Sequence, residues 1–423
     1  MRKNKGKYIV GYDLSRRYAQ ISYLEMGSGK AETLSMVAGE QQYNIPLVLY
    51  KNEEDNKWWI GREAIRRHAG LGGLLVEELL ELACRGEWVE SYPEPYDPCV
   101  LLAIFIRRSL SLLSIIAEYD NIWGIMFTLE ELGQTEVEVM RRVIEYLQLP
   151  QCVIRFVRKE ESLYHYTVHS ERQLWQEEVL VYEFTEKGLV RVALRQNKRT
   201  TPRVFLTEKE VFPGFEEAAP DTEEAGRARD RRFTEVLEKE FDGRKVSSVY
   251  LIGDGFEGDW YQSSIRFLCT RGRVFRGNNL YSKGACYCML DLETKQGSVG
   301  EQVYLGEDKL LANVGMEILR QGKPAYLAVL DGGSSWYEAG KEWEVILENS
   351  SSLTFTITPL NGDNRKEAVL ELDGLRGEDQ PFVRVRIEAF MVTARKMRIR
   401  VTDRGFGEFY PATKRCWEED FTL

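Results

Sequence analysis

Histidine is scarce in this chain: His68, His165 and His169 are the only three among 423 residues. A helix would place His165 and His169, which are four residues apart, on one face, where two imidazoles can hold a metal ion. Neither belongs to a His-Glu-x-x-His pattern, however, and the surrounding sequence indicates no third ligand. We therefore expect no zinc-hydrolase site.

Cysteine is also sparse, with seven residues that form no disulfide framework. This odd, scattered set indicates a reducing compartment. The closest pair, Cys286 and Cys288, is separated by one residue, which is a poor spacing for zinc, and we interpret both as buried thiols. A Gly-x-Ser-x-Gly elbow and a P-loop Gly-Lys-Ser sequence are absent, so hydrolases and nucleotide-binding proteins of those types are excluded.

The chain has no long uninterrupted hydrophobic run. Its basic N-terminus is not followed by the apolar segment of a signal peptide. The most apolar stretch, residues 101–117, contains Arg107 and Arg108 and indicates a buried helix rather than a membrane span. The net charge of -10 opposes binding to the phosphate backbone of nucleic acids. We expect a cytoplasmic protein with neither membrane nor nucleic-acid partners.

Strand-like and helix-like segments alternate over residues 1–300, which predicts an α/β fold with internal duplication. The first two strands are expected to form a hairpin around a turn at residues 11–18. Residues 196–230 are polar and contain Pro213 and Pro220, so we interpret them as a loop or a reduced, partly mobile insertion. Residues 301–423 instead contain strands in succession with alternating apolar and polar positions, which predicts an all-β sandwich domain.

Residues 8–23 (YIVGYDLSRRYAQISY) resemble the first phosphate loop of the actin-like, ribonuclease-H-like ATPase superfamily, especially of the seventy-kilodalton heat-shock chaperones. In that family the strand ends in an aspartate that orients magnesium, and the amides of the following turn hold the phosphates. Asp13 matches the aspartate, Ser15 stands at a glycine, and Arg16 and Arg17 stand at threonines. The two arginines either hold a phosphate in a different way or lie on the surface of a hairpin.

Two further segments match the same family in the same order. Residues 43–64 resemble its passage from an Ile-Pro-Ser strand to a Gly-x-x-Ala helix start. Residues 249–256 resemble its adenosine motif, in which Gly253, Asp254 and Gly255 would let a nucleoside approach the backbone, with Gly284 in the small pair that packs the next helix. The resemblance, which covers residues 8–290, implies binding of ATP or ADP with magnesium.

The second phosphate loop departs from the family at residues 179–191. Glu183 replaces the aspartate, and Thr185, Glu186 and Lys187 replace glycines that would surround the phosphates. The added side chains block close approach, and the carboxylate of Glu186 would stand next to an anion. We interpret this segment as an ordinary hairpin turn.

Other catalytic features of the family are also reduced. Residues 76–84, where the family has a catalytic lysine, contain none. Glu160 matches the water-orienting glutamate only loosely, and the alternative is a solvated acid at a helix start. Residues 196–241 are too few for the lobe that clamps the adenine in the chaperones.

The C-terminal residues carry a second resemblance. Residues 382–387 and 397–409 are similar to the closing strands of the chaperones' substrate-binding sandwich, which implies a protein or peptide partner. The whole chain, including residues 360–363 and 417–421, also resembles a bacterial family of unknown function with this architecture.

Three hypotheses follow. The first is a chaperone-like pseudo-ATPase, a binding scaffold and not an enzyme, that holds nucleotide weakly or not at all and binds its partner through the sandwich. The second is a divergent active ATPase or kinase that uses Asp13 for magnesium. The third is an actin-like filament protein, against which the appended sandwich and the missing clamp lobe count.

Overall fold

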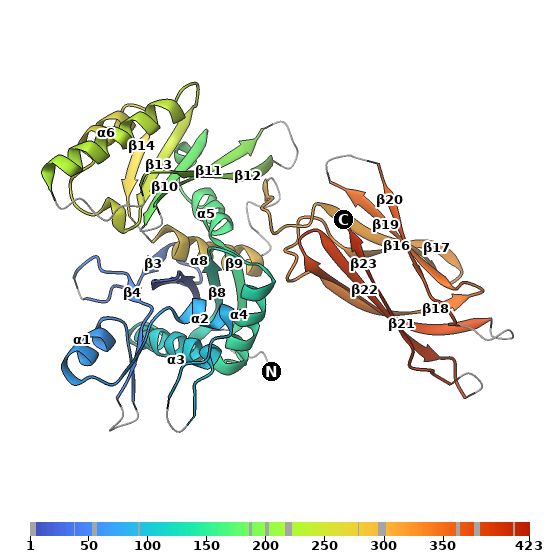
Figure 1. Ribbon diagram of the computed structural model, residues 1–423. Coiled ribbons are helices and arrows are strands. Elements are labelled where there is room, and N and C mark those ends of the chain that lie inside the picture. The colour runs from blue at the N-terminus through green and yellow to red at the C-terminus, as the bar shows by residue number, and fades with distance from the viewer. Residues whose placement is uncertain are drawn as a thin grey trace. The chain divides into compact units, whose positions relative to one another are not determined.

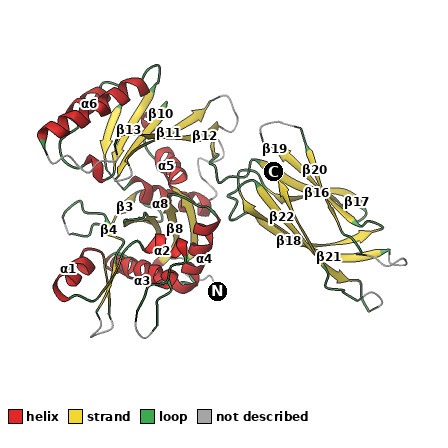
Figure 2. Ribbon diagram, viewed as in Figure 1, coloured by secondary structure: helices red, strands yellow, loops and turns green. Residues whose placement is uncertain are grey.

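The computed structural model describes residues 6–37, 39–52, 57–91, 94–185, 188–198, 203–215, 222–277, 279–294, 302–360, 364–375, 381–408 and 411–423. The chain divides into two compact units, Met1–Tyr304 and Leu305–Leu423. The first unit is mixed α/β, and the second is all-β in its described residues (Figures 1 and 2).

The first sheet of the α/β unit is built around a strand that is buried on both faces. Its strands are β1 (Tyr8–Leu14), β2 (Tyr18–Glu25), β3 (Ala31–Thr33), β4 (Ile45–Pro46), β8 (Ile122–Leu129) and β9 (Val153–Arg158). The order is β3-β2-β1-β8-β9, with β4 beside β2; β1 runs antiparallel to β2 and parallel to β8. The turn expected at residues 11–18 is wrong in its first half, because β1 remains buried and paired as far as Leu14. Asp13 therefore lies inside the strand.

The second sheet repeats this arrangement. Its strands are β10 (Glu178–Thr185), β11 (Gly188–Asn197), β12 (Arg203–Phe212), β13 (Val246–Ile252), β14 (Arg273–Arg276) and β15 (Gln302–Tyr304). Their order is β14-β13-β10-β11-β12-β15, in which β10 and β11 are antiparallel, β11 and β12 are antiparallel, and β10, β13 and β14 are parallel. β10 thus lies between one antiparallel and one parallel neighbour, as β1 does.

The equivalence of β1 and β10 extends to single residues. Each strand shifts register against its parallel neighbour directly after its first residue, at Tyr8 in β1 and at Glu178 in β10. Asp13 and Glu183 each lie five positions beyond that residue. The internal repeat therefore places one carboxylate at the same point of each sheet.

In the described part of residues 196–230, a regular strand and the start of a helix stand where a loop or reduced insertion was expected. β12 pairs with β11 along its length, and α6 (Glu223–Glu240) begins at a Thr222 cap whose side chain accepts a hydrogen bond from the Ala225 amide. α6 buries Phe233 and Leu237 in the core. The charged residues belong to the exposed faces of a regular strand and helix, which explains why composition alone indicated a loop.

Helices cover the sheets of the α/β unit, as Figure 2 shows in red. They are α1 (Gly61–Leu71), α2 (Leu79–Arg85), α3 (Pro98–Ser111), α4 (Gln134–Leu147), α5 (Lys159–Val168), α6, α7 (Gln262–Cys269) and α8 (Leu280–Thr294). A small antiparallel sheet has the order β6 (Trp58–Ile60), β5 (Leu49–Lys51) and β7 (Leu74–Val76); its first two strands precede α1 in the sequence, and β7 lies between α1 and α2.

One stretch among the described residues, Pro98–Ile115, is long and apolar enough to cross a membrane by length and composition, with mean hydropathy 1.7. It is 56% buried, and Leu101, Phe105 and Ile106 are completely inaccessible. This burial is that of a core helix, as expected for residues 101–117, and is consistent with a soluble protein.

α8 packs against both β1 and α5 at glycines. A Cβ atom added to Gly11 would lie 1.9 Å from the carbonyl oxygen of Ser282 in α8, and one added to Gly284 would lie 1.9 Å from the carbonyl oxygen of Ser162 in α5. Side chains are excluded at both points, because backbone cannot retreat as a flexible side chain can. Gly284 thus packs closely against a neighbouring helix, as the small pair of the resembling family would.

We predict that Gly284→Ala lowers the free energy of unfolding by about 1–3 kcal/mol, because the added methyl group forces α5 and α8 apart. Chemical denaturation monitored by circular dichroism measures the change. Gly277→Ala is the matched control, since an added Cβ there meets nothing within 4 Å. Equal stability of the two variants would show that the helix contact is looser than described.

The all-β unit consists of two antiparallel four-stranded sheets. One contains β17 (Lys323–Leu330), β16 (Ala312–Arg320), β19 (Ser352–Pro359) and β20 (Lys366–Glu371); the other contains β18 (Gly340–Glu348), β21 (Phe382–Thr393), β22 (Lys396–Gly405) and β23 (Cys416–Thr422). Val383, Val385 and Ile387 are fully buried, and the arginines between them face outward into ion pairs. The alternation gives each sheet one buried face. Residues 361–363 and 409, within the motifs considered above, lie outside the described residues.

Candidate functional site

The two equivalent carboxylates meet at a buried lysine. Glu183 accepts an ion-paired hydrogen bond from Lys159, the first residue of α5, with Nζ 3.1 Å from Oε1. Asp13 is completely buried and Lys159 is 5% exposed. Ser15 donates to Oδ1 of Asp13 at 3.3 Å, while Oδ2 has no hydrogen-bond partner among the residues that the structure describes. We call Asp13, Lys159 and Glu183 the ion cluster.

Burial and neighbouring charges set the protonation of this cluster. Burial raises the pKa of Asp13 to about 6; Lys159 and Ser15 oppose that rise, and Glu183 and Glu130 add to it. Burial also acts against the charge on Lys159, but Glu183 and Asp13 outweigh it and hold the lysine pKa well above its usual value. Lys159 is therefore a cation, and Asp13 titrates close to neutral pH.

The second oxygen of Glu183 is also bound. Tyr281, in α8, donates its hydroxyl to Oε2 at 3.3 Å. Burial, followed by the charge of Glu183, raises the tyrosine pKa well above its usual value, so the hydroxyl keeps its proton. Nζ of Lys159 lies 5.0 Å from the Tyr281 ring centroid, which adds a cation–π contact. Both oxygens of Glu183 are thus held by groups within the protein.

A cavity of about 90 Å³ lies beside the ion cluster. Its lining includes the predicted residues Ser15, Arg16, Arg17, Glu183, Thr185, Gly253 and Asp254, together with Tyr18, Glu130, Lys159, Val190 and Lys209. The structure therefore brings both phosphate-loop segments and the adenosine motif to one place. Sites for small molecules usually measure about 300–1,000 Å³, so this cavity is small for a nucleotide.

Three of the cations that line this cavity have carboxylate partners. Lys159 pairs with Glu183; Nε of Arg16 lies 3.5 Å from Glu81, and Nζ of Lys209 lies 3.7 Å from Glu130. A phosphate that entered would compete with these carboxylates for positive charge.

A second cavity, of about 480 Å³, adjoins the first at Gly253 and Asp254. It is lined by Gln41, Tyr43, Leu251, Ile252, Gly253, Asp254, Phe256, Glu257, Arg276, Gly277 and Asn279. Its lining includes Gly253 and Asp254 of the segment that, by the resemblance, would contact a nucleoside. Its size is within the usual range for a small-molecule site.

The glycines of the predicted adenosine motif are constrained by the protein itself. Gly253 has a φ of 94°, and a Cβ there would lie 2.2 Å from the Phe184 carbonyl oxygen. A Cβ at Gly255 would lie 2.4 Å from the Phe184 ring. Gly253 lines both cavities, and Gly255 lines neither. Packing against Phe184 therefore accounts for both glycines without a ligand.

Glu160 does not join the ion cluster. Its carboxylate pairs with Nε of Arg158 at 3.2 Å, and the residue is 8% exposed, so the alternative of a solvated acid is wrong. The residue that faces Glu183 is Lys159, one position earlier, which sequence reasoning missed. The signal was a lysine directly after an apolar strand, at the start of a helix.

The remaining predicted residues lie elsewhere. Gly284 contacts Ser162 and lines neither cavity. Glu186 and Lys187 lie outside the described residues.

Fold and site together define a protein with an α/β unit, in which repeated sheets bring two carboxylates to a buried lysine, followed by an all-β unit. The chain belongs to the family described as "Family of unknown function (DUF5716) C-terminal", which matches residues 30–307. Residues 309–423 match the "Domain of unknown function (DUF8552)". No curated protein matches the chain. Lys159 and Glu183 lie within the first match, and Asp13 precedes it.

Proposed function

We propose that this chain is a chaperone-like pseudo-ATPase of the actin-like superfamily: a scaffold for a protein or peptide partner that binds nucleotide weakly or not at all. The observation that carries the proposal is the ion cluster. Lys159 is bound to Glu183 beside the predicted phosphate loops, where an ATPase would need positive charge for its substrate. The shared strand order of the two sheets supports a duplicated fold of the actin-like kind.

Energetics favour weak nucleotide binding. A phosphate that recruited Lys159 would leave Glu183, whose side chain is 18% exposed, without its cation; breaking a buried ion pair costs about 3–5 kcal/mol, and this partly exposed pair costs less. Recruiting Arg16 or Lys209 would likewise separate each from its carboxylate. Much of the attraction of phosphate to the cavity is offset in this way.

The ion cluster fits magnesium poorly. The unpartnered Oδ2 of Asp13 offers one oxygen ligand. Mg²⁺ requires octahedral oxygen coordination, however, and the neighbouring Lys159 ammonium repels a cation. We therefore derive no catalytic step through magnesium.

A divergent ATPase or kinase is the second candidate. It is favoured by the 480 Å³ cavity at Gly253 and Asp254. For this function, nucleotide binding would have to move Glu183 away from Lys159.

The partner surface is proposed on the all-β unit. Cross-strand ion pairs, such as Arg386 with Glu342 at 2.6 Å and Arg400 with Glu418 at 2.8 Å, cover the outer face of the β21-containing sheet. In the other sheet, Leu319 and Tyr326 are 69% and 58% exposed, and Tyr326 belongs to the edge strand β17. An exposed edge suits an added peptide strand. The aromatic pair Trp336 and Tyr337 is buried and does not contribute.

We predict that calorimetric titration with Mg-ATP or Mg-ADP detects no binding tighter than a dissociation constant of about 1 mM, roughly -4 kcal/mol. Glu81→Gln should increase the affinity several-fold, because it releases the Arg16 guanidinium at the cavity. Glu63→Gln, whose ion pairs lie along α1 and away from both cavities, is the matched control. Micromolar binding by the unmodified protein would contradict the proposal and favour the divergent ATPase.

A further inference from the structure

A buried cluster on α5 and α8 is not used by the proposed function. Asp291 is hydrogen-bonded to both nearby histidines: Nδ1 of His165 lies 2.7 Å from Oδ2, and Nε2 of His169 lies 2.9 Å from Oδ1. A carboxylate only accepts hydrogen bonds, so in this contact His165 carries its proton on Nδ1 and donates it to Asp291.

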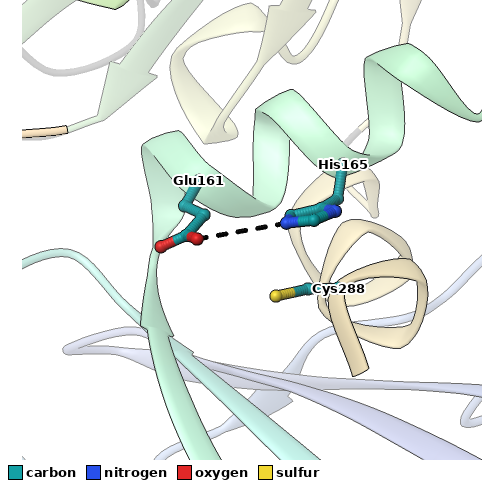
Figure 3. Close-up of side chains that lie close together, drawn as sticks. All are labelled: Glu161, His165 and Cys288. Atoms are coloured by element: carbon teal, nitrogen blue, oxygen red, sulfur yellow. Dashed lines mark ion pairs between the residues drawn. The ribbon is translucent and has the colours of Figure 1, made fainter. Parts of the chain in front are cut away.

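With Nδ1 bound to Asp291, the other ring nitrogen of His165, Nε2, is directed toward two further atoms that can bind a metal ion. Nε2 lies 4.0 Å from Oε1 of Glu161, one helical turn earlier, and Sγ of Cys288 in α8 faces the same space (Figure 3). The three ligand atoms all lie within 4.8 Å of one another. His165 and Cys288 are 7% and 3% exposed.

We propose that Glu161, His165 and Cys288 form a binding site for a zinc-class divalent cation. Zinc bonds of about 2.0–2.3 Å in tetrahedral geometry place ligand atoms roughly 3.5 Å apart, so small side-chain movements bring these three atoms onto one ion. The 4.0 Å separation of Nε2 and Oε1 is too long for a hydrogen bond. Asp291 supplies the carboxylate that fixes the ring orientation of a metal-binding histidine.

The ligand set selects the type of metal. A thiolate and an imidazole favour zinc over magnesium or calcium, which take oxygen ligands. Three protein ligands leave a fourth position for water. Tyr164, which precedes His165, is 2% exposed, and its buried hydroxyl has no hydrogen-bond partner in the described part of the chain.

A bound ion would join α5 to α8 across the contact at Gly284. Because Lys159 is the first residue of α5, the same ion would help to fix the helix that carries the ion cluster. The proposed metal site does not involve nucleotide, so this proposal does not depend on whether the proposed function is correct.

The test is the metal content of the full-length protein. Because the site is buried, we would supply zinc during expression, dialyse against a weak chelator and measure metal per chain by mass spectrometry. We expect about one zinc ion per chain. Cobalt introduced in the same way should give a thiolate-to-cobalt charge-transfer band. Cys288→Ser should abolish the band and lower zinc affinity at least tenfold.

The matched control is Cys286→Ser, two residues earlier on α8, where the buried thiol faces the carbonyl oxygen of Ile9. It should keep both the zinc and the band. Glu161→Gln, which is nearly isosteric, and Asp291→Asn should each lower zinc affinity, by about 10–100-fold for the second. The proposal is overturned if the folded protein takes up no zinc, or if Cys286→Ser and Cys288→Ser behave alike.

Discussion

Replacing Lys159 with methionine is expected to lower the free energy of unfolding by about 3–5 kcal/mol at pH 7. Methionine fills a similar volume but leaves the buried Asp13 and the partly buried Glu183 near each other without a cation. Urea denaturation followed by tryptophan fluorescence would measure the loss. Lys209→Met is the matched control: its ion pair with Glu130 is 3.7 Å long and its side chain is 41% exposed, so the expected effect is below about 1 kcal/mol.

The pH dependence of this loss identifies its cause. The folded pKa of Lys159 is raised, so its stabilising contribution is fully present below the ordinary lysine pKa of 10.5 and disappears only at higher pH. As pH falls through about 6, Asp13 takes up a proton in the folded state, and one of the uncompensated charges disappears. The Lys159→Met defect should therefore be smaller at pH 5 than at pH 8. An equal defect at both values would mean that lost packing, not lost charge, dominates.

Asp13→Asn should make the protein more stable than the unmodified chain at pH 8, by up to about 3 kcal/mol. Its folded pKa, about 6, lies above the ordinary value of 3.8, so between these values the folded state holds a proton that the unfolded chain has lost. Stability from this group is present at low pH and is lost as pH rises through 6. Asparagine cannot ionise, so it avoids that loss.

The quantity to measure is the difference in unfolding free energy between Asp13→Asn and the unmodified protein, from pH 4 to pH 8. We expect a difference that is small at pH 4, grows up to about pH 6 and levels off at higher pH. Asp259→Asn, at an exposed position, controls for the removal of a carboxylate outside the cluster. A difference that stays constant over this range would show that Asp13 ionises without penalty in the folded protein.

Sequence patterns predicted the parts of this fold that repeat locally. The alternation of apolar strands and amphipathic helices indicated a mixed α/β unit, and the resemblance to the two phosphate loops drew attention to Asp13 and Glu183. The strand at residues 203–212 and the first part of α6, up to residue 230, were missed because a strand or helix with one charged, exposed face has the composition of a loop.

The candidate site depended on contacts that no local pattern contains. Lys159 becomes significant only because helix α5 begins at that residue and directs it to Glu183, which is distant in the sequence. Similarly, His165 and Cys288 each looked like a poor metal ligand in their own segments. Packing of α5 on α8, through the glycine at 284, is what brings them together.

The position of α8 also determines when this unit can fold during synthesis. Its residues Ala285 and Met289 pack in one core with Ile9 of β1 and Met126 of β8, and Ser282 hydrogen-bonds Ser22 at 2.8 Å. The ribosome therefore releases the first sheet long before the helix that covers it exists. Contacts between residues so far apart in the sequence form slowly, and nascent chains with uncovered sheets aggregate readily. Until α8 emerges, we expect the face of the first sheet that it covers to remain open to solvent.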